Sequence, residues 1–184
     1  MLKIEHKSEP NFFIKSKKKA KNWSDIQEIR FKLREHILQE QKSMCAYCEK
    51  FISANKEKSN IDHFKTRNLF PNLVFEYKNL FISCNSLNQC SNHKDNLGLN
   101  KIEMDNLISP LEINLLDVEY ISGKMYGKNE NIRKLIKVLN LNNKSLIEIR
   151  KNILLNLQYV DNFSVYELVR NFKGYLTYFQ FLQK

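Results

Sequence analysis

Four cysteines and an Asp-His pair mark one stretch of this chain: CAYC at residues 45–48, IDHF at 61–64, NLFISC at 79–84 and QCSNHK at 89–94. A CxxC turn brings two thiolates close enough to share one zinc ion, and a second pair completes a tetrahedral site with bonds of about 2.3 Å. The second pair is Cys84 and Cys90, which a polar, flexible stretch of five residues separates. We therefore predict a structural zinc held by Cys45, Cys48, Cys84 and Cys90.

Two other interpretations of these cysteines remain open. They could be four unrelated buried thiols, or CAYC could be a redox motif. A redox CxxC is expected beside a βαβ pattern, and none surrounds Cys45. A zinc with four protein ligands is saturated, so it would support the fold and would not activate water.

Length and composition set the class of protein. A chain of 184 residues fits one domain, and 42% hydrophobic residues can build a core. The sequence has no run of about eighteen apolar residues and its start lacks the apolar segment of a secretory signal, so we expect a cytoplasmic protein. Reduced thiols in that compartment favour metal over disulfides.

The net charge of +10 predicts a polyanionic partner, and nucleic acid is the commonest one. A lysine-rich composition inherited from an AT-biased genome explains the same charge. The charge therefore supports the motif and does not replace it.

We predict an α+β fold: a small zinc-stapled ββα-metal core, an N-terminal helix and a C-terminal helical region. Residues 1–23 are expected to form a loose basic arm that includes KSKKKAK at 15–21. A helix is expected over 25–41, with Ser24 and Gln27 forming a capping box, so the core with its helix spans 24–98. Apolar pairs between polar loops predict two short strands around the metal and then a helix from about residue 91. This stretch is too short to bury a core of its own, which is why it would need the metal.

Residues 99–184 complete the predicted organisation. A hairpin is expected across 117–126, and helices over 130–139, from 144 to about 159, and from 164 to about 182, all packed on the core.

Asp62 and His63 lie between the two cysteine pairs. A carboxylate suits a hard cation such as Mg²⁺ or Mn²⁺, and an imidazole with a pKa of about 6.5 can take a proton from an attacking water. Neighbours on a strand point to opposite faces, so a bend would have to bring the two to one reaction. Alone they would be read as an exposed polar pair, but the bracketing cysteines favour a catalytic interpretation.

The order CxxC, DH, NL, C and a final C followed by a basic residue resembles the HNH endonuclease family, with its ββα-metal fold. The resemblance implies that His63 is the general base and that Asp62 binds the catalytic Mg²⁺ or Mn²⁺. It also implies that Asn79 orients the imidazole through its side-chain amide.

A third metal-binding position is implied on the helix after the last cysteine, where the family usually has His or Asn. This chain has Ser91 directly after that cysteine, so His93 is the expected ligand and Asn92 the alternative. Lys94 matches the family's basic residue on this helix and is expected to contact phosphate.

Segments outside the motif are similar to the HNH subunit of Septu and retron-linked anti-phage systems: KSEP at 7–10, DNLISP at 105–110, SGKMYGK at 122–128, and LNLN followed by LIEIRK at 139–151. This resemblance implies a DNA endonuclease that works in phage defence with an ABC/SMC-like ATPase subunit (PtuA-like). The chain has no GxxxxGK[ST] motif, so ATP-dependent control would come from the other subunit. Aromatic residues near the C-terminus could form the docking surface or an ordinary helix core: Phe172, Tyr175, Tyr178, Phe179 and Phe181.

A function from another class is a non-catalytic, zinc-ribbon-like module that binds nucleic acid. It would use the same cysteines and the same basic charge, and it would leave the Asp-His pair and Asn79 without a role.

Overall fold

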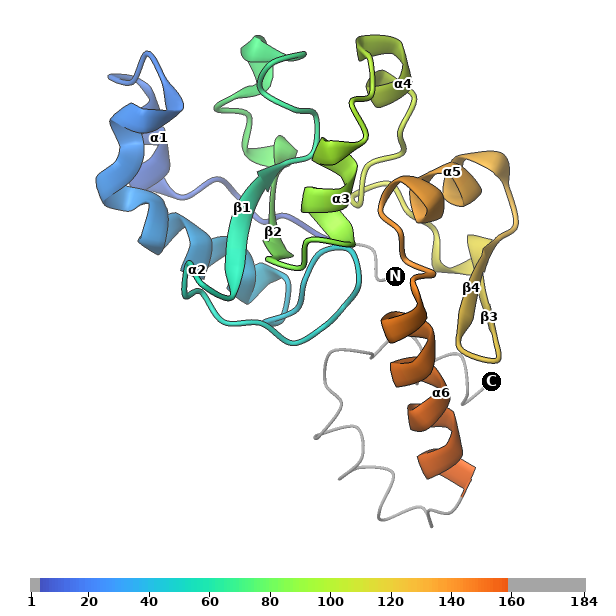
Figure 1. The fold of residues 1–184 in the computed structure, drawn as a ribbon. Helices are drawn as coiled ribbons and strands as arrows, with labels where there is room; N and C mark the ends of the chain where they lie inside the picture. The colour runs from blue at the N-terminus through green and yellow to red at the C-terminus, as the bar shows by residue number, and fades with distance from the viewer. Residues whose placement is uncertain (1–3, 159–184) are drawn as a thin grey trace.

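The computed structural model describes residues 4–158, and over these residues the fold is α+β with two separate two-stranded antiparallel sheets (Figure 1). The predicted fold class is confirmed at this level. Among the described helices, none has the length and apolar character needed to cross a membrane.

The first sheet pairs β1 (Ser59–His63) with β2 (Leu80–Cys84), so that Ser59 lies opposite Cys84 and His63 opposite Leu80. Every residue of β2 is buried, because both α2 (Arg30–Glu40) and α3 (Cys90–Asn96) contact this strand. Figure 1 shows the strand pair between these two helices. Two single turns of 3₁₀ helix, η2 (Pro71–Leu73) and η3 (Tyr77–Asn79), lie in the connection between the strands.

The free edge of β2 is completed by the segment that leads to the first cysteine pair. The Gln41 side chain accepts a hydrogen bond from Ile82 N at 2.7 Å and donates to Ile82 O at 2.9 Å. Ala46 N donates to the same carbonyl at 2.9 Å. These bonds satisfy backbone groups that would otherwise be buried without partners, and they hold CAYC beside the end of β2.

The N-terminal segment differs from the loose arm that we expected. Residues 11–17 form α1 (Asn11–Lys17), and Ile4 and Phe13 are buried in the core. His6 fixes the segment further, with Nδ1 2.7 Å from Glu40 Oε2 and Nε2 3.0 Å from Leu80 O. Apolar side chains between the lysines therefore outweigh the charge run, because their burial lowers the free energy more than solvation of an extended arm would.

The predicted helix over 25–41 begins earlier and in a different form. A 3₁₀ segment, η1 (Trp23–Ile29), precedes α2, and it contains a kink with non-helical angles at Ile26. The capping box uses Asn22 and Asp25, not Ser24 and Gln27, so the predicted cap was wrong by two residues. Asp25 accepts from the backbone N–H groups of Lys21 and Asn22, and these bonds hold its pKa below the usual value.

The second half of the chain is built around the predicted hairpin, which is confirmed as β3 (Val118–Ile121) and β4 (Lys124–Gly127). It follows α4 (Lys101–Asp105) and η4 (Leu115–Asp117) and packs against α5 (Glu130–Val138). The last described helix, α6 (Lys144–Gln158), passes the hairpin turn, where a Cβ on Gly123 would lie 2.5 Å from Ile147 O. Glycine is required at this turn by that close approach and by its φ of +79°.

The helices expected over 130–139 and from 144 onward are confirmed by α5 and α6. The helix expected from 164 to about 182, with its aromatic residues, lies outside the described residues.

Candidate metal centre and adjoining pocket

The four cysteine Sγ atoms lie within 4.8 Å of one another and are buried. The Sγ atoms of Cys45 and Cys90 are 3.8 Å apart, and those of Cys48 and Cys84 are 3.9 Å apart. A regular tetrahedron with zinc–sulfur bonds of 2.3 Å has edges of about 3.8 Å. None of the four is in a disulfide, so the cluster could hold a metal ion such as zinc, as predicted.

Hydrogen bonds of the backbone place three of the four cysteines. Cys45 N donates to Lys50 O and Glu49 N to Cys45 O, which closes the CAYC turn. Cys84 ends β2, and its N–H donates to Cys45 Sγ at 3.3 Å. Cys90 begins α3 with its N–H bonded to Leu139 O at 2.8 Å, so the C-terminal end of α5 also fixes the cluster.

The thiols also perturb one another. Hydrogen bonds from the neighbouring thiols hold the pKa of Cys84 far below its usual value, whereas burial raises the pKa of Cys90. Four thiolates in this volume would repel one another strongly without a cation. A divalent ion would remove this conflict, because it favours the deprotonated form of every ligand.

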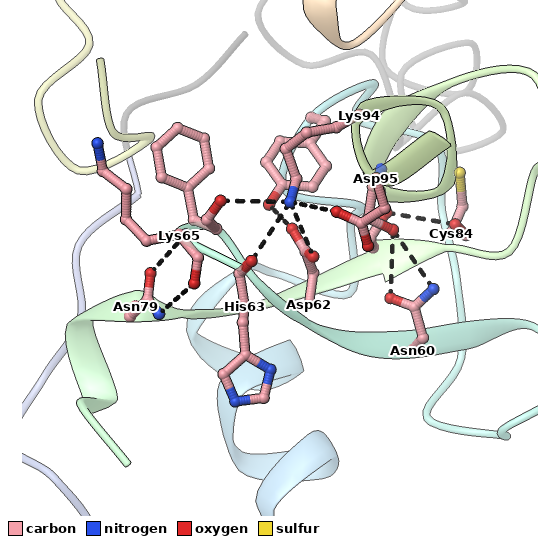
Figure 2. A network of polar contacts seen from close by, with 12 residues as sticks. Asn60, Asp62, His63, Lys65, Asn79, Cys84, Lys94 and Asp95 are labelled. Carbon is pink, nitrogen blue, oxygen red and sulfur yellow. Dashed lines mark hydrogen bonds and ion pairs between the residues drawn. The ribbon is translucent and has the colours of Figure 1, made fainter. Parts of the chain in front are cut away.

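A buried polar network lies beside the cluster, between β1 and α3 (Figure 2). Lys94, with no exposed side-chain surface, places Nζ 3.4 Å from Asp62 Oδ1 and 2.7 Å from Asp95 Oδ1. The same ammonium donates to the carbonyls of His63 at 3.3 Å and Phe64 at 3.2 Å. Burial alone would lower the pKa of Lys94, but the two carboxylates outweigh it and the pKa is raised.

The carboxylate of Asp62 has a second partner, the hydroxyl of Tyr47, which lies inside the CAYC turn. Burial, and then the charge of Asp62, raise the pKa of Tyr47 well above its usual value, so the hydroxyl keeps its proton and donates. Asp95 is about half exposed (48%), and burial together with repulsion from Asp62 raises its pKa.

The predicted role of Lys94 is not what the structure shows. A lysine with no exposed surface and four oxygen partners has no free donor directed to solvent, so it does not present a phosphate contact. Its position on the inner face of α3, one turn after Cys90, explains this burial.

His63 points away from this network, as strand alternation predicts for a neighbour of Asp62 (Figure 2). Its ring packs edge-on against Trp23, with centroids 4.4 Å apart, and its Nε2 lies 3.0 Å from Val74 O. Because a carbonyl oxygen only accepts, Nε2 carries the proton and Nδ1 holds the lone pair.

Burial lowers the pKa of His63 from 6.5 to about 4, although the hydrogen bond to Val74 O acts in the other direction. The positive charges of Arg67 and Lys94 lower it as well. The imidazole is therefore neutral at pH 7.

Asn79 makes its side-chain hydrogen bonds to backbone groups and not to the imidazole, so the direct orienting bond that the resemblance implied is not seen. Its Oδ1 accepts from Lys65 N at 2.8 Å, and its Nδ2 donates to Lys65 O at 3.0 Å and Leu73 O at 3.2 Å. Lys65 lies two residues after His63, and Leu73 lies directly before Val74, whose carbonyl is hydrogen-bonded to the His63 ring. Asn79 thus fixes both backbone segments that position His63.

The two expected ligands on α3 point elsewhere. His93 Nδ1 lies 2.8 Å from Val138 O, at the end of α5, and Asn92 donates to Ser86 O at 3.2 Å. Neither lies in the network around Asp62, because successive positions of a helix differ by about 100° and only Ser91, Lys94 and Asp95 face β1.

A pocket of about 410 Å³ opens over the network. Its walls include Asn60 and Asp62 from β1 and Ser91 and Asp95 from α3. Asn60 and Ser91 are hydrogen-bonded at 3.3 Å. Oxygen donors from carboxylate, amide and hydroxyl groups are the ligand types that Mg²⁺ and Mn²⁺ prefer.

Sequence reasoning missed four residues of this site: Tyr47, Asn60, Arg67 and Asp95. A signal existed for Asn60, because residues two apart on a strand share a face and Asp62 had been singled out. Tyr47 and Asp95 carried no comparable signal, since their contacts depend on how the CAYC turn and α3 pack against β1.

Comparison with known proteins gives no family for this chain: no family model matches its sequence, and no curated protein does. The resemblance to HNH endonucleases therefore remains a hypothesis from the motif.

Proposed function

We propose that this chain is a metal-dependent endonuclease of the HNH type that hydrolyses phosphodiester bonds of DNA. The proposal rests on two features that lie together at the end of β1. One is His63, a neutral histidine with a defined tautomer, and the other is a polar pocket lined by carboxylates. The possible zinc cluster joins the CAYC turn, the end of β2 and the start of α3, and so stabilises the strand–strand–helix unit that carries both.

His63 is the proposed general base. Its Nε2–H is bound to Val74 O, so Nδ1 is the atom that accepts a proton from the attacking water. The edge contact with Trp23 and the bonds from Asn79 to the adjoining backbone keep the ring in one orientation. Such fixed orientation lowers the entropic cost of reaching the transition state.

Asp62 and Asp95 are the residues that would hold a catalytic Mg²⁺ or Mn²⁺, and Asn60 and Ser91 add neutral oxygens in the same pocket. When bound, such an ion offsets the charge that grows on the phosphate and on the leaving oxygen. The Lys94 ammonium now lies between these carboxylates, so it competes with a divalent cation for them. In this proposal the metal ligand on α3 is Asp95, in place of His93, which the resemblance implied.

A nicking assay on supercoiled plasmid, with zinc-loaded protein and added Mn²⁺ or Mg²⁺, tests the proposal. His63→Ala and Asp95→Asn should each lower the nicking rate at least about a hundredfold, whereas His93→Gln, which removes an imidazole outside the pocket, should keep it. Mn²⁺ binding followed by electron paramagnetic resonance gives a readout without a partner protein: Asp62→Asn should abolish it.

A fully active His63→Ala variant would refute the assigned base. Wild-type protein that binds DNA but neither nicks it nor binds Mn²⁺ would instead be the non-catalytic, zinc-ribbon-like module. Loss of activity in His93→Gln with an active Asp95→Asn would return the metal ligand to the position that the motif indicated.

With this activity we propose that an ABC/SMC-like ATPase subunit controls the nuclease in an anti-phage complex. The support is the sequence resemblance and the lack of a P-loop motif in the 184 residues. Co-purification of the tagged chain from its native host, followed by mass spectrometry, is the test, and recovery without an ATPase of this class argues against the complex.

A further inference from the structure

A second hollow adjoins His63, next to the pocket that Asp62 lines. It is an open groove of about 680 Å³ whose wall includes Trp23 and Val74, the two residues that contact the His63 ring. His63 therefore adjoins both hollows: it lines the pocket, and its ring contacts two residues of the groove wall.

The charged side chains that line this groove are all positive. Its lining includes the cations Lys21, Arg30 and Arg67 and no carboxylate. Arg30 stacks on Trp23 and donates to Trp23 O at 2.7 Å, and its Nε has no hydrogen-bond partner within residues 4–158. Lys21 ends the KSKKKAK run, so that basic segment leads into the groove.

Arg67 connects the two hollows, because it lines both. It is exposed and makes no hydrogen bond or ion pair to any residue in the described part of the chain. An exposed guanidinium that no described residue holds by a hydrogen bond, at the junction of a carboxylate pocket and a basic groove, is suited to bidentate binding of a phosphate. Lys94 is buried, so binding of a phosphate at this place falls to Arg67.

We propose that the groove over Trp23 binds the sugar-phosphate backbone of a nucleic-acid strand, and that Arg67 holds a phosphate where the groove meets the Asp62 pocket. The inference rests on the proposed nuclease function, because it makes this groove the path of the strand on one side of the cleaved bond. Three cations facing one open channel supply the sequence-independent part of the affinity.

Trp23 makes the proposal directly measurable, since it is the only tryptophan of the chain. Titration of zinc-loaded full-length protein with a 20-nucleotide single-stranded oligodeoxynucleotide, without Mg²⁺ or Mn²⁺, should change the tryptophan fluorescence. Anisotropy of a labelled oligodeoxynucleotide gives the affinity independently. Arg67→Ala should weaken binding about five- to tenfold and reduce the slope of log affinity against log salt by about 0.7.

Lys137→Ala is the matched control, because it also removes one exposed positive charge but lies on α5 outside both hollows. It should leave affinity within about twofold. Arg67→Lys should recover part of the affinity, since it restores the charge without the bidentate geometry.

The inference is overturned if the oligodeoxynucleotide binds without changing the Trp23 fluorescence, if Arg67→Ala binds as tightly as Lys137→Ala, or if nothing binds. Its failure is distinct from failure of the nuclease proposal. An Arg67→Ala variant that nicks plasmid like the wild type refutes the groove alone, whereas loss of Mn²⁺ binding and nicking in the wild type refutes the nuclease.

Discussion

Lys94 offers the sharpest test, because the motif and the structure give it opposite roles. Replacement by Met removes the ammonium and keeps most of the aliphatic chain. In the structure this change leaves Asp62, which is 4% exposed, without its counter-charge, and leaves the carbonyls of His63 and Phe64 without their donor. Removing one partner of a buried ion pair costs about 3–5 kcal/mol.

This loss is a large share of the stability of a domain, which is about 5–15 kcal/mol. Urea denaturation of zinc-loaded protein at pH 7, followed by circular dichroism, should give a free energy of unfolding lower by about 3–5 kcal/mol in Lys94→Met. The control Lys137→Met, on the exposed side of α5, should change it by less than about 0.5 kcal/mol.

A double-mutant cycle with Asp62→Asn isolates the interaction. Once the carboxylate is neutral, loss of the ammonium should cost less, and we expect a coupling energy of about 1–3 kcal/mol. The reasoning is refuted if Lys94→Met is as stable as Lys137→Met and only weakens DNA binding, because that is the result for a lysine that contacts phosphate.

Three further predictions concern the cysteine cluster, His63 and the hairpin turn. Cys48→Ser should lower the zinc content, measured by plasma mass spectrometry, from about one ion per chain to near zero. It should also unfold the protein, because structural zinc contributes folding energy directly. A folded variant with full zinc content would contradict the site. Folding lowers the pKa of His63 from 6.5 to about 4. Between pH 6.5 and about pH 4 the unfolded chain therefore binds a proton at His63 that the folded chain does not, so the free energy of unfolding decreases as the pH is lowered through this range. At pH 5 the loss relative to neutral pH is about 2 kcal/mol, and it should be missing in His63→Gln; equal pH dependence of the two proteins would contradict it. Gly123→Ala should lower the melting temperature by several degrees, because the added Cβ would lie 2.5 Å from Ile147 O. Gly98→Ala is the control: Gly98 also has a positive φ, but a Cβ there would meet no atom within 4 Å.

Local patterns were sufficient for most elements of the fold. The hairpin with Gly123 at its turn, α5 and α6 follow from turn chemistry and from apolar residues at helical spacing, which depend on residues near in sequence. The cap of this helical region was placed wrongly because Asn22 and Ser24 are both acceptable caps, and burial of Trp23 and Ile26 in η1 chooses between them. The run of lysines concealed Phe13, whose burial depends on contacts distant in sequence.

For the candidate site, the sequence by itself determined which residue types meet. Two cysteine pairs at these spacings, with an Asp-His pair between them, bring four thiols together, and strand alternation separates Asp62 from its neighbour. The packing of α3 against β1 decided which side chains of that helix enter the pocket, because rotation about the helix axis buries Lys94 and turns His93 toward α5. The tautomer of His63 likewise depends on a carbonyl eleven residues away that only the folded connection brings within hydrogen-bonding distance. Sequence spacing determines which residues share one face of a helix or strand. Long-range packing determines which of these faces points toward a neighbouring element.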